Sequence, residues 1–364
     1  MYKANLARHL TRCNGRPVEE LPHYHELDVN VALRKSASNF FKVDLSSSLN
    51  HWPNIIARIR SMYTHLGMSD IPMDVREHEL FQDVVVHGGK QKRKHAKQHA
   101  SFLAHLEDRN LLQLDNDLCY MEFGCGRAEL SAHMAHALAR KPTSHPCAFT
   151  LIDRDAHQNR CDRYIRQHLN AQNLVDRIRI DIKDFNLKAY QHPLNYDNMS
   201  SDSKIVAISK HLCGAATDLT LRCLMQAPSK VQAMMIAVCC HHRCKFEHYV
   251  DPDYLAEMEI EPHFFQILSS MSAWATCKPD HPKNLSRKQS QIKNNQYDGN
   301  NYDDDDHVSG LTIQEREDMG LMCKRILDFG RLRFLRAHGF DIETFYYCDQ
   351  ETTLENFAVL AQKK

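Results

Sequence analysis

Apolar and polar residues follow each other along the chain in blocks that predict strands and helices in turn. Short apolar runs bounded by turn residues are typical of buried strands, and apolar positions three and four residues apart are typical of helices. The apolar runs predict strands at 118–123, 148–153, 177–182, 204–209, 233–240, 340–347 and 355–362. The helical spacing predicts helices at 127–140, 156–171, 214–226 and 318–338. This order predicts a doubly wound, Rossmann-like α/β fold with a seven-stranded sheet whose last hairpin is antiparallel.

The segment before this alternation, 51–110, carries helical patterns. Amphipathic helices are predicted from Trp52 to Leu66 and from Arg76 to Val85, and a further helix begins after Gly88-Gly89. The first turns of that helix contain the cations Lys90, Lys92, Arg93, Lys94 and Lys97. These cations could neutralise RNA phosphates, but they suit a solvated helix face equally well. We therefore expect a helical, basic, RNA-contacting extension at 51–110, followed by the catalytic domain at 111–364.

Three further segments differ from this core in composition. Residues 1–14 contain His9 and Cys13, which have the spacing of the second half of a zinc finger, whereas zinc needs four ligands. Residues 15–50 are rich in proline, serine and asparagine and are predicted to be a linker. Residues 278–310 are polar and include the acidic run 303–306, so we expect a disordered excursion from the core.

Composition narrows the class of protein. The 364 residues are 43% hydrophobic and 25% charged, which is ordinary for a globular protein with a sizeable core. The formal net charge is zero, so a nucleic-acid surface must be a local patch. No apolar run is long enough to span a bilayer and the N-terminus is not a signal peptide, so we expect a soluble intracellular protein, cytoplasmic or nuclear, without a membrane partner. Thirteen cysteines, an odd number, favour reduced thiols or metal ligands over a disulfide framework.

A glycine turn follows the first predicted strand. Its sequence from Glu122 to Ala128 is Glu-Phe-Gly-Cys-Gly-Arg-Ala, and glycine lets a backbone approach a ligand closely. The pattern lacks the third glycine of dinucleotide-binding turns and is similar to motif I of S-adenosylmethionine methyltransferases, with a structural glycine turn as the alternative. Asp153 ends the next strand, where an acid can bind ribose hydroxyls. The predicted cofactor contacts are Glu122, Phe123, Gly124, Cys125, Gly126 and Asp153.

Polar residues also end the next predicted strands, and ligands of such sheets bind beyond these carboxyl ends. Asp181 or Asp184 could hydrogen-bond an adenine amine, and a surface acid is an equal alternative. Lys210 and His211 leave a buried strand at a glycine turn, which favours a role in the site, and Asp218 suits a helix cap.

The fifth strand runs into Cys-Cys-His-His-Arg-Cys at 239–244. Three cysteines and two histidines within six residues are ligands that zinc prefers, so a zinc site is one interpretation of this run. Neighbours on an extended segment point to opposite faces, however, and the usual gaps of two to four residues between zinc ligands are absent. We therefore favour an active-site loop that presents imidazole and guanidinium groups to a nucleotide.

Several motifs together resemble one family, the eukaryotic tRNA 2′-O-methyltransferases that modify the fourth nucleotide of the acceptor stem. They are Glu-Phe-Gly-x-Gly at 122–126, Lys-His-Leu-Cys-Gly-x-Ala-Thr-Asp at 210–218, the 239–244 run, Ser-Ala-Trp-Ala-Thr-Cys at 272–277 and the helix containing 323–331. The similarity runs from about His95 to the C-terminus. His9 and Cys13 resemble the last two ligands of the family's Cys-His-His-Cys finger, although this chain lacks the first two.

The resemblance implies a methyltransferase fold and methyl transfer from S-adenosylmethionine to a ribose 2′-hydroxyl in the tRNA acceptor stem. The protein must align that hydroxyl with the methyl group and help to remove its proton. We expect Lys210 or His211 to contact the hydroxyl, with Lys210 also near the cofactor. His241 and His242 are expected to flank the hydroxyl and Arg243 to hold the adjacent phosphate. Zinc at His9 and Cys13 would need the missing ligands to be supplied, and no protein partner is indicated.

Two alternatives keep the same fold. An RNA base N-methyltransferase often carries a polar-Pro-Pro-aromatic turn after the fourth strand, whereas Lys-His-Leu-Cys stands at 210–213, which favours ribose. A non-catalytic RNA-binding protein would not need the intact glycine turn and Asp153. A cofactor titration distinguishes this second alternative from an enzyme.

Overall fold

The computed structural model describes residues 21–33, 51–113, 118–141, 147–158, 160–169, 174–193, 203–276 and 307–364. Three predicted features lie wholly or largely outside the described residues: the half finger at His9 and Cys13, residues 15–20 and 34–50 of the linker, and residues 278–306 of the predicted excursion with its acidic run at 303–306.

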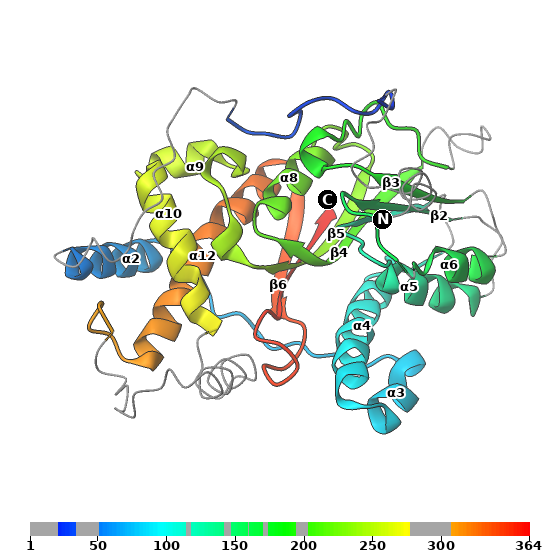
Figure 1. The fold of residues 1–364 in the computed structure, drawn as a ribbon, viewed down its shortest axis with the longest axis horizontal. Coiled ribbons are helices and arrows are strands. Elements are labelled where there is room, and N and C mark those ends of the chain that lie inside the picture. Colours follow the sequence, from blue (N-terminus) through cyan, green and yellow to red (C-terminus); the bar gives the residue numbers. More distant parts are fainter. Residues whose placement is uncertain are drawn as a thin grey trace, which may run out of the picture.

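A seven-stranded sheet in the order β3-β2-β1-β4-β5-β7-β6 forms the centre of the molecule (Figure 1). The strands are β1 Leu118–Phe123, β2 Ala148–Asp153, β3 Val175–Arg179, β4 Lys204–Cys213, β5 Val231–Cys239, β6 Phe340–Tyr346 and β7 Phe357–Lys363. Strands β1 to β5 are parallel, and β7 runs antiparallel to both β5 and β6. This confirms the predicted doubly wound fold with an antiparallel last hairpin. The strand order reverses between β1 and β4, where such sheets bind ligands.

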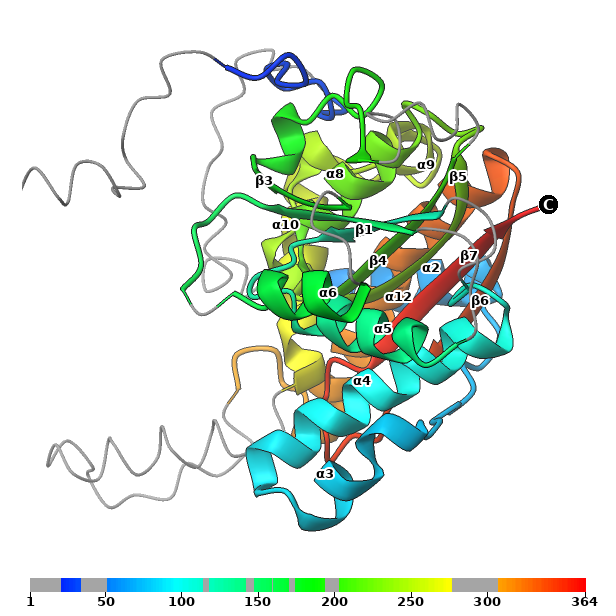
Figure 2. The ribbon, with the colours of Figure 1, turned by 90° about the vertical axis from the view of Figure 1, so that its right-hand side faces the viewer.

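Helices cover both faces of the sheet. They are α2 Trp52–Leu66, α3 Gln82–His87, α4 Lys90–Asp108, α5 Glu129–Ala139, α6 Asp162–Leu169, α8 Ala215–Leu224, α9 Pro252–Glu257, α10 Pro262–Met271 and α12 Ile313–Ala337. Figure 2 shows α4, α5 and α6 on the near face of the sheet, with α12 behind it. Each face therefore has its own hydrophobic core, which is the layered arrangement expected of this fold class.

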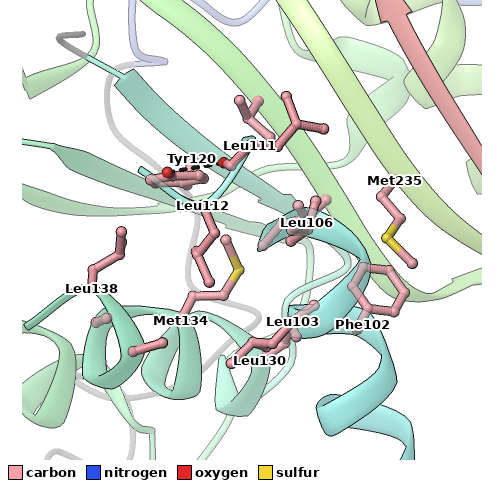
Figure 3. Packing of buried hydrophobic residues seen from close by; sticks show 14 of the residues in the cluster. Phe102, Leu103, Leu106, Leu111, Leu112, Tyr120, Leu130, Met134, Leu138 and Met235 are labelled. Atoms are coloured by element: carbon pink, nitrogen blue, oxygen red, sulfur yellow. Dashed lines mark hydrogen bonds between the residues drawn. The ribbon is translucent and has the colours of Figure 1, made fainter. Parts of the chain in front are cut away.

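The core beneath α4 and α5 shows how the sheet is covered. Leu103 and Leu106 of α4 pack with Leu130 and Met134 of α5, and Tyr120 of β1 lies beside them (Figure 3). The four side chains from the two helices are at most 1% exposed. The Tyr120 hydroxyl donates a hydrogen bond to the Leu111 carbonyl at 3.1 Å, so its polar atom is satisfied inside an apolar layer.

Local hydrogen bonds explain where the predicted boundaries were wrong. Strand β3 ends at Arg179 instead of 182, because the Asp181 side chain accepts from the Lys183 N–H and starts a 3₁₀ turn. Strand β4 runs to Cys213 instead of 209, because Cys213 still pairs with Cys239 of β5. Helix α12 begins at Ile313 instead of 318, where Thr312 and Glu315 form a capping box.

The predicted N-terminal extension lies in two places. Helix α2 packs against α12 with its buried face, whereas α4 lies on the other face of the sheet. A single helix from Arg76 to Val85 was wrong, since His78 is extended and its side chain accepts from the Leu80 N–H at the start of a 3₁₀ turn. Part of the predicted linker, 21–33, is anchored to the core, because the Asn30 amide donates to the Ile182 carbonyl at 2.6 Å.

Candidate active site

The glycine turn connects the ends of β1 and β2. Gly124 and Gly126 have φ angles of 63° and 52°, which glycine adopts without strain. The Gly126 N–H donates to the Asp153 carboxylate at 2.8 Å, and the same carboxylate accepts from the Asp155 N–H at 2.9 Å. The acid at the end of β2 therefore holds the turn in place.

The other predicted residues of the turn are buried and connect it to the core of the protein. Glu122 is buried, and its carboxylate accepts from the N–H and the hydroxyl of Ser131 at 3.2 and 2.5 Å. Burial raises the pKa of Glu122 to about 7. The buried Phe123 accepts a hydrogen bond from Ser209 through its carbonyl at 2.7 Å, and the buried Cys125 contacts Arg177. Among the predicted residues of this turn, Gly124 alone lines the adjacent cavity.

A cavity of about 770 Å³ opens beyond the carboxyl ends of the strands. Its volume is in the range of small-molecule sites. On one side of the reversal in strand order the cavity is lined by the acids Asp153 and Asp181, which end or follow β2 and β3, and on the other side by His211, His242 and Arg243, from the ends of β4 and β5; we call these two sides its walls. The first wall, which also carries Arg154 and Lys183, offers carboxylates that can accept from hydroxyls or an amine, and the second offers imidazole and guanidinium groups.

The apolar and backbone parts of the cavity also fit S-adenosylmethionine. Ile180, Ile182 and Leu219 line it, as a flat adenine requires. A Cβ added at Gly124 would lie 3.2 Å from the His211 carbonyl oxygen, so the turn lies close against β4 and a larger residue would have to push the two apart. Asp184, the alternative to Asp181 at this strand end, is buried and accepts from the Asp28 N–H and the Lys183 ammonium, so it supports the fold.

The structure separates Lys210 from His211. His211 is exposed and lines the cavity, whereas the half-buried Lys210 points to the side of α4. There its ammonium nitrogen donates to His99 Nε2 at 2.7 Å and lies 3.4 Å from His95 Nδ1. Burial, with Lys210 beside it, lowers the pKa of His99 well below its usual value, so the neutral ring accepts this hydrogen bond. Burial also lowers the pKa of Lys210.

The structure also removes His241 from the cavity. Its ring is 1% exposed, and its Nε2 lies 2.7 Å from the Asp328 carboxylate. The Arg331 guanidinium donates to the Asp328 carboxylate at 3.0 Å and to the Asp218 carboxylate at 2.6 Å. Groups from the end of β5, from α8 and from α12 therefore form one buried ionic network. Asp218 does not cap α8, whose N-cap residue is Gly214 with no side-chain hydrogen bond. The 210–218 motif, the 239–244 run and the helix containing 323–331 thus contact one another through this network, which stabilises the fold.

The cations of α4 begin at the carboxyl edge of the sheet. Lys90, Lys92 and Arg93 are exposed and Lys94 is half-exposed in the first turns of the helix. Lys97 instead lies 3.2 Å from the Asp349 carboxylate in an ion pair. The carbonyl of Arg109, after the end of α4, accepts from Gln362, which pairs with the beginning of β5, whereas Lys97 contacts Asp349, which follows the end of β6. The exposed cations at the start of α4 therefore lie toward the edge of the sheet where the cavity opens.

Sequence reasoning missed several residues of the site. Arg154, Lys245 and His248 also line the cavity. Arg154 directly follows Asp153 and could have been inferred from its place at the strand end. His248 had no local signal, because a 3₁₀ turn at Phe246–His248 returns the chain to the cavity.

Comparisons with known proteins identify the family of the chain. A family model described as "Methyltransferase TRM13" matches residues 97–362. The "tRNA:m(4)X modification enzyme TRM13" of Schizosaccharomyces pombe is 34% identical over 375 residues, covering 100% of this chain and 93% of that protein. The enzyme of that name from Scheffersomyces stipitis is 32% identical, covering 98% and 85%, and the human homolog is 28% identical, covering 99% and 84%. Because the family model and these relatives cover most of the chain, the protein belongs to the TRM13 methyltransferase family.

Proposed function

We propose that the protein transfers a methyl group from S-adenosylmethionine to the ribose 2′-hydroxyl of nucleotide 4 in the acceptor stem of tRNA. The carrying observation is one cavity with a nucleoside-binding wall, Asp153 and Asp181, opposite a wall with His242 and Arg243. Membership of a methyltransferase family and the names of the relatives, which specify tRNA and m(4)X, support the substrate. None of the described helices has the length and apolar content that a bilayer crossing requires.

The cofactor would lie along the acidic wall. S-adenosylmethionine supplies an activated methyl group when bound. Each oxygen of Asp153 accepts one backbone N–H, and Oδ1 also lies 3.3 Å from Nε2 of His157, so Oδ2 has a second lone pair for a ribose hydroxyl. Asp181 accepts the Lys183 N–H through Oδ1 and offers its other oxygen to the adenine amine. Asp153 and Asp181 thus orient the nucleoside, with Gly124 beneath it.

The opposite wall would position the RNA. A ribose hydroxyl is a poor acid, so its proton needs an acceptor at hand. His242 is exposed in the cavity, whereas Nδ1 of His211 is already 3.1 Å from the Cys239 sulfur. We therefore assign proton removal to a ring nitrogen of His242 and ribose contact to Nε2 of His211. Arg243 binds the neighbouring phosphate through its planar guanidinium. His241 and Lys210 have no direct role in this scheme.

The proposed reaction is tested with labelled S-adenosylmethionine and unmodified tRNA. After alkaline hydrolysis, we expect label in an alkali-resistant dinucleotide, because a methylated 2′-oxygen cannot attack the adjacent phosphate. A matched tRNA with a 2′-deoxynucleotide at position 4 should accept no label. Label in mononucleotides, or on the deoxy substrate, would indicate base methylation, and no label together with no cofactor binding would indicate a binding protein.

Replacing Arg243 by alanine tests whether this residue binds the RNA and not the cofactor. We expect kcat/KM for tRNA methylation to fall about 100-fold, because a phosphate loses charge-assisted hydrogen bonds of about 1.5 to 3 kcal/mol each. Cofactor affinity, measured by titration calorimetry, should not change. Arg336→Ala is the control, since this exposed arginine lies in the last turn of α12 and away from the cavity. Weaker cofactor binding in Arg243→Ala would place this residue in the cofactor site instead.

The exposed cations of α4 are expected to contact phosphates of the tRNA. Changing Lys92, Arg93 and Lys94 to glutamine should lower the slope of log K against log salt by about 0.9 for each phosphate that the variant no longer neutralises. Binding is measured by fluorescence anisotropy across a salt series. The control removes as much charge at the opposite edge of the sheet, with Lys204, Lys230 and Arg336 changed to glutamine. Equal slopes in wild type and the α4 variant would make this segment a solvated face.

A further inference from the structure

Three potential metal ligands converge where β4 and β5 end. Nδ1 of His211 lies 3.1 Å from the Cys239 sulfur, and the sulfurs of Cys213 and Cys239 are 3.7 Å apart. All three ligand atoms lie within 4.8 Å of one another. The convergence results from strand pairing, because Cys213 and Cys239 are register partners on neighbouring parallel strands. Sequence spacing could not reveal it, since the ligands come from two segments more than twenty residues apart.

The separation of the two sulfurs matches a tetrahedral zinc site, whereas the 3.1 Å between His211 Nδ1 and the Cys239 sulfur is shorter than zinc ligands require, so the imidazole would move outward on binding the ion. A zinc–sulfur bond of about 2.3 Å places two tetrahedral thiolate ligands about 3.8 Å apart, and a zinc–nitrogen bond of about 2.0 Å places the imidazole nitrogen about 3.5 Å from each sulfur. The observed sulfur separation of 3.7 Å is close to the first value. It is far from the roughly 2.05 Å of a disulfide. Two thiols and one imidazole are also ligands that zinc prefers over hard cations.

A candidate for the fourth ligand follows this trio in the chain. Cys240 comes directly after Cys239 and is half-exposed, but it is not among the residues whose ligand atoms all lie within 4.8 Å of one another, so its side chain must turn toward the trio to bind the same ion. Its φ of 52° turns the chain away from the strand direction, so Cys239 and Cys240 need not point to opposite faces as they would in an extended segment. This backbone turn removes the objection that adjacent cysteines cannot share one ion.

We propose that His211, Cys213 and Cys239 bind one zinc ion, with Cys240 completing the tetrahedron. The ion lies under the turn that carries His242 and Arg243. That turn is packed tightly on β4, since a Cβ added at Gly214 would lie 2.6 Å from the backbone of Arg243. The metal links the ends of β4 and β5 and positions these two side chains at the cavity. His211 binds through Nδ1, which leaves Nε2 directed to the substrate.

The test measures zinc in the full chain purified with reduced thiols. A His9→Ala, Cys13→Ser background removes any metal held by the N-terminal half finger. In that background we expect about one zinc per chain, as a closed four-ligand site holds a single ion. Adding Cys213→Ser and Cys239→Ser should lower the content below about a tenth of an ion. Cys161→Ser, a half-buried cysteine outside the cluster, is the matched control and should keep the metal.

A second measurement tests the site without changing its cysteines, so its result does not depend on variants that could unfold. Cobalt(II) replaces zinc in the His9→Ala, Cys13→Ser protein, and thiolate-to-cobalt charge-transfer absorption reports sulfur ligands directly. We expect strong charge-transfer bands and the visible bands of tetrahedral cobalt. Their absence would leave only a hydrogen-bonded group of thiols and would overturn the proposal. Zinc content unchanged by Cys213→Ser and Cys239→Ser would overturn it as well.

Discussion

Asp153→Ala is expected to weaken S-adenosylmethionine binding about 100-fold. The carboxylate accepts the N–H groups of Gly126 and Asp155, so its loss releases the glycine turn. In the proposed cofactor site, the loss also removes the acceptor of the ribose hydroxyls. Two hydrogen bonds to a charged group contribute about 1.5 kcal/mol each or more, and about 3 kcal/mol corresponds to a hundredfold change in Kd.

Calorimetric titration with S-adenosylmethionine measures this change. Asp155→Ala is the control, because Asp155 is an exposed acid two residues further along. Asp153→Asn keeps the size of the side chain and can still accept one N–H, so it should lie between wild type and alanine. An Asp153→Ala protein that binds the cofactor as wild type does would remove this acid from the cofactor site.

Arg331→Met should lower the free energy of unfolding by about 3 to 5 kcal/mol, the range found when one partner of a buried ion pair is removed. The guanidinium contacts the Asp218 carboxylate at 2.6 and 3.0 Å and the Asp328 carboxylate at 3.0 Å. Asp218 is 0% and Asp328 1% exposed. Although burial alone would raise it, His241 and the arginines beside it lower the pKa of Asp328, so the acid stays charged.

Urea denaturation followed by circular dichroism measures the loss. Arg336→Met, an exposed position on the same helix, should change stability by less than about 0.5 kcal/mol. The double variant Arg331→Met, Asp218→Asn should recover part of the loss, since it no longer buries an unpaired charge. Equal stability of Arg331→Met and wild type would show that this network is dispensable for the fold.

Local patterns determined the elements whose boundaries rest on their own residues. Helix α2 at Trp52–Leu66 and strands β1 and β2 match their predictions residue for residue, because each carries a clear apolar pattern with turn residues at its ends. The end of β4 was missed because the polar residues Lys210 and His211 interrupt its apolar run at a register shift, and Leu212 and Cys213 beyond them are held by pairing with β5. A strand edge set by a neighbour carries no periodic signal of its own.

In the candidate site, too, some placements follow from local patterns and strand order, and others depend on neighbouring elements. Gly126 and Asp153 are neighbours, as expected when the ends of two consecutive strands of a βαβ unit meet. Asp181 also lies in the cavity, as a residue at the end of the third strand should. These placements follow from the order of elements alone.

By itself, the sequence determined the fold class, the glycine turn and the acids at the strand ends, because these depend on short-range patterns and on strand order. The tertiary structure alone decided the role of each residue in the polar motifs. It placed Lys210 against α4 and His211 in the cavity, buried His241 against Asp328, and joined Cys213 to Cys239. Which side of a strand faces a cavity, an ion partner or another strand depends on elements distant in the chain, and those contacts form only when the layers pack.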